Sequence, residues 1–160
     1  MKINNRKIIF IAIFGAVALF AACSSSGPTL GINTGSDGLA LRGFDAVAYF
    51  AVDSAVKGDA KYEYAWNGAK WLFTSEENMK KFQASPETYA PQFGGYCSFA
   101  VSEGYTADAD PEAWKVVDGK LYLNYNKQVR EKWEKDQNER IEKGAANWRS
   151  FKSKKPEHKG

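Results

Sequence analysis

An almost uninterrupted apolar run from Ile8 to Ala22 indicates which residues belong to the mature, folded protein. Three basic residues precede the run, small residues close it, and Cys23 follows it. A charged start, an apolar stretch and small residues at its end are the three parts of a secretory signal. The run is shorter than the roughly 20 apolar residues that span a bilayer comfortably. We therefore expect residues 1–22 to be removed on export, which leaves residues 23–160 to form the mature protein.

The segment resembles a bacterial lipoprotein signal, in which the cysteine after the cleavage point is acylated and becomes the first mature residue. Cys23 is the expected lipidation site, and Ser24 behind it implies the outer membrane by the usual bacterial sorting pattern. We expect a protein of the cell envelope that is anchored by an N-terminal lipid and faces the periplasm. An ordinary signal peptide cut nearby and an uncleaved anchor are the alternatives.

The charge of the chain gives no reason to expect a nucleic-acid partner. The full chain carries a net charge of +3, but Lys2, Arg6 and Lys7 leave with the signal and no acid leaves with them. The mature chain therefore holds equal numbers of acidic and basic residues. Basic residues gather only at the C-terminal end, where residues 152–160 read as a solvated basic tail. The expected partner is the membrane, reached through the lipid.

The counts of cysteine and histidine exclude several kinds of site. If Cys23 carries lipid, Cys97 is the only thiol that remains, so no disulfide can form within the chain. The only histidine, His158, lies in the basic tail. A Ser-His-Asp triad, a Cys-His pair and a histidine-based metal site are therefore all but excluded. We expect no cofactor and no tightly held zinc.

Hydrophobic patterning predicts a small α+β domain behind a flexible tether. Residues 23–38 are rich in Ser, Gly and Thr and read as the tether. Two short antiparallel hairpins are expected, one around Asn67-Gly68 and one around Asp118-Gly119-Lys120. Ser75 is placed to cap a helix that continues through Phe82. The strongest pattern predicts one long amphipathic helix from Lys127 to Trp148, packed against the hairpins.

Residues 39–151 resemble the YHS-domain family, in the branch of secreted YHS proteins. Three stretches carry the resemblance: LRGFDAVAYF at Leu41–Phe50, WNGAKWLFTSEENMKKFQASPETYAPQFGGYCSFAV at Trp66–Val101, and DPEAWKVVDGKLYLNYN at Asp110–Asn126. Metal-binding relatives place two cysteines where this chain has Thr74 and Asn78. A hydroxyl and an amide do not replace two thiolates as zinc ligands, so we expect no structural metal site at this point.

Cys97, the last residue of Gly94-Gly95-Tyr96-Cys97, is the candidate catalytic residue. Selenocysteine holds this position in some members of the branch, and the resemblance therefore implies redox chemistry at Cys97. The two glycines would allow backbone N–H groups to face a thiolate. A single thiol would be oxidised to sulfenic acid or exchange with another thiol, and a partner protein or small thiol would have to resolve it. The alternative is that Cys97 is a buried, inert core residue.

Four further side chains are candidates for a pocket beside Cys97, namely Asp45, Tyr49, Tyr96 and Trp114. Asp45 and Tyr49 would share one face of a helix and supply a carboxyl group and a phenol. Alternatively, Asp45 caps that helix and Tyr49 packs in the core. The aromatic side chains could likewise stack on a flat ligand or form the core. Three functions stay open: a redox thiol protein, a non-catalytic binding module for a metal ion or small ligand, and a structural lipoprotein. The sequence does not decide whether the chain is an enzyme.

Overall fold

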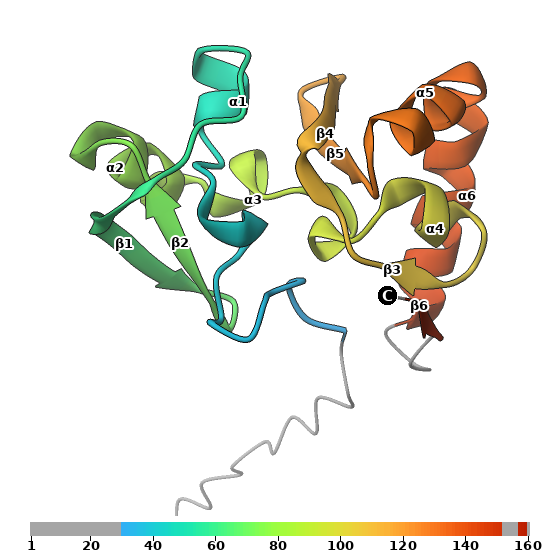
Figure 1. The fold of residues 1–160 in the computed structure, drawn as a ribbon, viewed down its shortest axis with the longest axis horizontal. Helices are drawn as coiled ribbons and strands as arrows, with labels where there is room; N and C mark the ends of the chain where they lie inside the picture. The colour runs from blue at the N-terminus through green and yellow to red at the C-terminus, as the bar shows by residue number, and fades with distance from the viewer. Residues whose placement is uncertain (1–29, 152–156, 160) are drawn as a thin grey trace, which may run out of the picture.

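The computed structural model describes residues 30–151 and 157–159, which form two adjoining halves, each built on an antiparallel hairpin (Figure 1). The first half contains η1 (Leu41–Gly43), α1 (Ala48–Ala51), β1 (Asp59–Trp66), β2 (Ala69–Phe73) and α2 (Glu76–Ala84). Two short helices, α3 (Pro86–Tyr89) and η2 (Gln92–Gly95), lead into the second half. The second half contains α4 (Ser98–Ser102), β3 (Thr106–Ala107), β4 (Asp110–Val117), β5 (Lys120–Asn124), α5 (Lys127–Lys135), α6 (Gln137–Phe151) and β6 (His158–Lys159). This is the expected α+β class.

The first hairpin turns at Asn67 and Gly68, as the sequence predicts. Both residues have positive φ angles, 50° and 76°, and the link between β1 and β2 is two residues long. Asn and Gly are the residues that tolerate this backbone conformation in a tight hairpin turn. The register of the two strands shifts at the other end of the hairpin, between Asp59 and Glu63.

Helix α2 covers the hairpin through Phe82, which is fully buried. The Phe82 ring lies 4.7 Å from the ring of Trp71 and 5.2 Å from that of Phe73. The predicted cap of this helix is confirmed, because the Ser75 hydroxyl accepts a hydrogen bond of 3.1 Å from the Asn78 N–H. The aromatic residues of β1 and β2 therefore form core between the hairpin and α2.

The second hairpin turns at Asp118 and Gly119, again with positive φ angles of 49° and 70°. Helices α4 and α5 pack against this hairpin, and α6 packs against α4 (Figure 1). Trp133 of α5 is fully buried, and its ring lies 5.4 Å from that of Tyr122 on β5. The apolar stripe predicted for the C-terminal segment therefore faces the core.

The single helix predicted from Lys127 to Trp148 is wrong in one respect, because the chain forms two helices. Asp136, between α5 and α6, has non-helical angles of φ −124° and ψ 37°. Its carbonyl accepts the N–H of Arg140 at 3.0 Å, so α6 starts anew at this residue. Asp is a favoured residue at a helix start, and the break lets α6 pack against α4 rather than continue along α5.

Backbone hydrogen bonds attach both ends of the described chain to the rest of the fold. The Asn33 N–H donates to the carbonyl of Gly94 at 2.8 Å, which attaches the segment before η1 to η2. The short strand β6 pairs in parallel with β3 (Figure 1). Within residues 30–151 and 157–159, no helix is long and apolar enough to cross a membrane. The signal segment, Cys23 and residues 152–156 of the predicted tail lie outside the described residues.

Candidate functional site

The Asp45 side chain is completely buried and organises the first half of the fold. Its Oδ1 atom accepts hydrogen bonds from the N–H groups of Val47 at 2.8 Å and Ala48 at 3.3 Å, at the start of α1. Its Oδ2 atom accepts from the Thr74 N–H at 2.9 Å, the Thr74 hydroxyl at 2.7 Å and the Asn78 Nδ2 at 2.7 Å. A buried carboxylate is stable only when its oxygens are hydrogen-bonded in this way. Asp45 therefore has a structural role at the start of α1, in agreement with the alternative hypothesis that it caps this helix.

The two residues that stand where metal-binding relatives carry thiolates, Thr74 and Asn78, thus have another role here. Both donate to Asp45, and Asn78 Nδ2 also donates to the Thr74 hydroxyl at 3.1 Å. Their donor hydrogens point at a carboxylate, whereas a metal site would need lone pairs pointing at a common centre. Among the described residues, no group of three or more His, Cys, Asp or Glu side chains is placed to hold a metal ion.

Tyr49 and Trp114 pack against each other in the core that joins the two halves. The Tyr49 ring meets that of Trp114 edge to face at 5.2 Å, and the Tyr49 hydroxyl donates to the carbonyl of Pro111 at 3.1 Å. Burial, with a smaller contribution from the nearby Asp110 carboxylate, raises the pKa of Tyr49 far above its ordinary value. The phenol therefore stays protonated and serves as a hydrogen-bond donor to the backbone.

Cys97 lies at the point where the second half is closed. Its N–H donates to the carbonyl of Ala107 on β3 at 2.9 Å, and its backbone bridges to Leu123 of β5. Its Sγ atom accepts a hydrogen bond of 3.2 Å from the N–H of Tyr125. The residue is 1% exposed to solvent, so the thiol is part of the protein interior.

Burial decides the protonation state of Cys97. Loss of solvation raises the pKa of the thiol, and the backbone N–H groups of Ala100, Tyr125 and Phe99 offset this only in part by stabilising the thiolate. The backbone amides around the sulfur belong to residues that follow Cys97, and not to the Gly94-Gly95 turns from which the sequence suggested they would come. The Cys97 thiol is accordingly protonated at neutral pH.

A cavity of about 230 Å³ lies against Cys97. Its walls are mostly apolar and aromatic, and its lining comprises Cys97, Phe99, Ala100, Tyr105, Ala107, Tyr125, Val129 and Lys159. Among the described residues, Lys159 of β6 is the single charged residue of this lining, and its Nζ atom lies 4.9 Å from the centre of the Tyr105 ring. We call this the Cys97 cavity.

The sequence suggested four side chains for a pocket beside Cys97, and none of the four lines the Cys97 cavity. Asp45, Tyr49 and Trp114 belong to the core described above. Tyr96 is half-buried and points elsewhere, with its ring 6.1 Å from that of Trp148 and 6.0 Å from that of His158. Burial and the nearby Asp108 carboxylate raise its pKa. The cavity residues lie on or next to α4, β3, α5 and β6, and apart from Lys159 only their aromatic and apolar character could have suggested them from the sequence.

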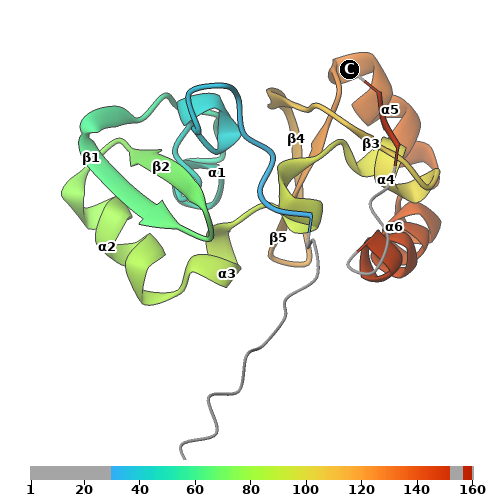
Figure 2. The ribbon, with the colours of Figure 1, turned by 90° about the horizontal axis from the view of Figure 1, so that it is seen from below.

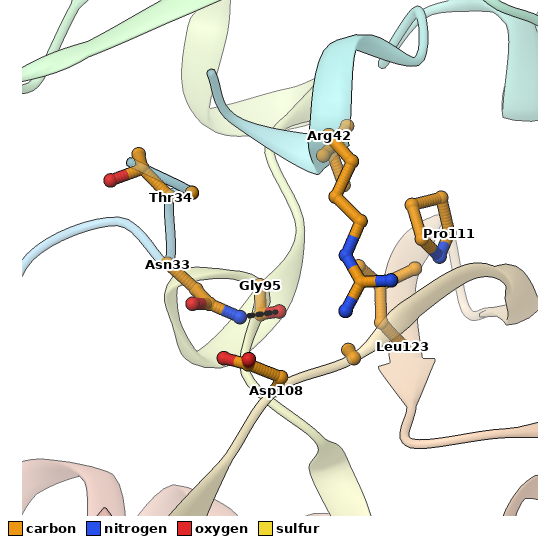
Figure 3. A pocket seen from close by; sticks show the side chains of 10 residues that line it. Asn33, Thr34, Arg42, Gly95, Asp108, Pro111 and Leu123 are labelled. Atoms are coloured by element: carbon orange, nitrogen blue, oxygen red, sulfur yellow. Dashed lines mark hydrogen bonds between the residues drawn. The ribbon is translucent and has the colours of Figure 1, made fainter. Parts of the chain in front are cut away.

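A second, much smaller pocket of about 50 Å³ lies at the junction of η1, η2 and β5. Figure 3 shows the Arg42 side chain reaching into it toward Leu123 and Asp108, with Asn33 donating to the carbonyl of Gly95 at its side. Arg42 has a positive φ of 49°, an uncommon conformation outside glycine. No sequence motif indicates that Arg42 enters a pocket, because its position depends on this local backbone conformation. The pocket has room for about one water molecule or a small ion.

The comparison with protein families places a known domain in this chain. The YHS domain matches residues 47–93, from the start of α1 to η2. The chain therefore contains a YHS domain, which includes Thr74, Asn78 and the α2 helix but ends before Cys97. No curated protein and no solved structure matched the chain. The secreted branch remains a prediction.

We predict that Asp45→Asn destabilises the fold strongly. An amide at this position turns one acceptor into a donor that faces the donors of Thr74 and Asn78. Each buried group left without a partner costs about 1–3 kcal/mol. Chemical denaturation should show this loss in the free energy of unfolding. Glu76→Gln, which changes an exposed carboxylate paired with Lys80, is the matched control and should change stability little. Equal stability of Asp45→Asn and the control would contradict the structural role.

We predict that Cys97 in the folded protein is labelled more slowly by a thiol reagent than Cys97 in the unfolded chain. Because burial raises the pKa of the thiol, the rate of labelling should rise with pH through an inflection that lies above that of the unfolded chain. Stopped-flow labelling across pH, with and without denaturant, measures both inflections. A folded-state inflection below the unfolded one would show that the backbone amides win over burial.

Proposed function

We propose that this chain is a lipid-anchored protein of the cell envelope whose domain binds a small apolar ligand in the Cys97 cavity. The observation that supports this proposal is the cavity itself: about 230 Å³ of space bounded mainly by apolar and aromatic side chains. An apolar cavity of about 150 Å³ is already large enough to bind benzene. The Cys97 cavity therefore suits a ligand of one or two rings or a short aliphatic chain.

The chemistry of the walls favours binding over reaction. The thiol is protonated and 1% exposed, and it accepts a hydrogen bond from the Tyr125 backbone. The described residues provide neither a histidine nor a carboxylate in the cavity lining to take a proton from it. Within the lining, Phe99, Ala107 and Val129 offer only apolar contacts. A polar end of the ligand would meet Lys159.

The second candidate function is a redox thiol at Cys97, and one observation favours it. The N–H groups of Ala100, Tyr125 and Phe99 stabilise negative charge on the sulfur. They would also stabilise the sulfenate that forms when a thiolate attacks a peroxide oxygen and releases the other oxygen as water or hydroxide. A partner thiol would then have to reduce the sulfenic acid, since Cys97 is the only free cysteine among the described residues. Mass spectrometry after mild peroxide, with a sulfenic-acid label, tests this function.

We predict that indole binds the Cys97 cavity and that Val129→Trp prevents it. Val129 lines the cavity from α5, and a larger side chain there fills the space while helix α5 is retained. A titration followed by amide NMR should show shifts centred on Cys97, Ala100 and Tyr105 in the wild type. The same titration of Val129→Trp should show none of them.

The matched control for this experiment is Val52→Trp, which adds the same side chain at a position that is 63% exposed. It should bind indole as the wild type does. Bound indole should also slow the labelling of Cys97, because the ligand closes the approach to the sulfur. Wild-type spectra that indole leaves unchanged would contradict the binding function.

We predict that Cys23→Ser abolishes lipid attachment. The prediction rests on the apolar run that ends at Ala22 and on the cysteine that follows it. Metabolic labelling with a fatty-acid analogue, followed by separation of inner and outer membranes, measures attachment and location. Equal labelling of the wild type and the mutant would contradict the anchor, and it would leave the Cys97 cavity proposal untouched.

A further inference from the structure

A cavity larger than the Cys97 cavity lies on the other side of η2, and neither Cys97 nor Asp45 lines it. It has a volume of about 550 Å³ and is formed by the segment from Leu30 to Ile32, the turn of the first hairpin, α3, η2 and α6. Figure 2 shows α3 and α6 on opposite sides of this N-terminal segment. Cavities of roughly 300–1,000 Å³ are typical of sites for small organic ligands. We call this the η2 groove.

Two indole rings from different halves of the fold line the groove, Trp66 from β1 and Trp148 from α6. Each is held by further rings. Trp66 lies 5.7 Å from both Trp71 and Phe82, and Trp148 lies 6.1 Å from Phe93. Rings fixed by packing lose little freedom when a ligand arrives, so they provide two prepared apolar surfaces.

The backbone of η2 is shaped to admit Trp148. Gly94 has a positive φ of 62°, and a Cβ atom there would lie 3.1 Å from Trp148 Cη2 and 2.8 Å from the carbonyl oxygen of Gly31. Gly144 of α6 likewise lies so close to Phe93 that a Cβ atom would come within 2.8 Å of Cζ. The first glycine of the Gly94-Gly95-Tyr96-Cys97 motif therefore serves the η2 groove, whereas its cysteine lines a different cavity.

Each polar side chain of the lining ends in a planar group that can form hydrogen bonds. These side chains are Asn67, Glu87, Gln92 and Arg149. None of these four side chains forms a hydrogen bond or ion pair within the part of the chain that the structure describes. Together they offer free donors and free acceptors, and the charges of Glu87 and Arg149 cancel. Amide, carboxylate and guanidinium groups can each contact two neighbouring hydroxyl groups at once.

We propose that the η2 groove binds a neutral saccharide. A pyranose ring with equatorial hydroxyl groups has two apolar C–H faces, which suit the surfaces of Trp66 and Trp148, and a polar edge, which suits planar side chains that both donate and accept. A charged ligand would find no net charge of opposite sign in the groove. The proposal is independent of the Cys97 cavity, which shares no lining residue with the groove.

The test is calorimetric titration of the purified chain with two neutral β-1,4-linked trisaccharides, cellotriose and N,N′,N″-triacetylchitotriose. At least one should bind with a Kd of about 1 mM or below. Sorbitol, which has hydroxyl groups but no ring face, and the tripeptide Gly-Trp-Gly should not bind. Absence of binding by both trisaccharides overturns the proposal, and so does binding of the tripeptide in their place.

Variants then assign the binding to the groove. Arg149→Ala and Gln92→Ala change side chains that make no hydrogen bond or ion pair in the described structure, so both should keep the fold and weaken the trisaccharide by about tenfold or more. Trp148→Phe should weaken it by narrowing one apolar surface. Val129→Trp, in the Cys97 cavity, is the control and should bind the sugar as the wild type does. Unchanged affinity in the three groove variants overturns the proposed site.

Discussion

The hydrogen bonding of the Asp45 carboxylate holds together the elements from which the first half of this fold is made. One carboxylate oxygen fixes the start of α1, and the other fixes Thr74 at the end of β2 and Asn78 in α2. The Asp45 side chain is fully buried, and the bonds to Val47 and Ala48 are buried with it, whereas Thr74 and Asn78 donate from nearer the surface. Removing the Asp45 carboxylate would leave all of these donors without their acceptor, so these residues act as a unit.

This network also explains how β2 and α2 are held together although Thr74 and Asn78 occupy the positions at which thiolates were considered. A tetrahedral zinc site would hold β2 and α2 through soft, negatively charged ligands. Here Asp45, which precedes α1, supplies the carboxylate, and Thr74 and Asn78 supply the hydrogen-bond donors. In a zinc site the residues at these two positions would carry the negative charge, whereas here they donate hydrogen bonds to a negatively charged side chain. The YHS domain of this chain, residues 47–93, is therefore closed by hydrogen bonds.

The Gly94-Gly95-Tyr96-Cys97 motif divides its residues between two cavities. Gly94 allows the close approach of Trp148 and of the N-terminal segment on one side of η2. Cys97 pairs with β3 and β5 on the other side and presents its sulfur to an apolar cavity. Since the Cys97 thiol is buried and its pKa is raised, the motif shapes the two cavities more than it provides a reactive thiolate. This separates the small-ligand proposal at Cys97 from the saccharide proposal at the η2 groove, and each has its own set of variants.

Local sequence signals determined the α+β class, both hairpin turns and the cap of α2, because these features depend on a few neighbouring residues. Asn67-Gly68 and Asp118-Gly119 tolerate positive φ angles, and Ser75 carries a hydroxyl in reach of the next turn. The break at Asp136 was not apparent, since an aspartate is common inside amphipathic patterns and only the packing of α6 on α4 makes it a helix start. Tertiary structure alone decided the burial of Cys97, the partners of Asp45 and the two cavities. These depend on contacts between residues far apart in the chain, such as Asn33 with Gly94 and Cys97 with Tyr125, for which hydrophobic periodicity carries no signal.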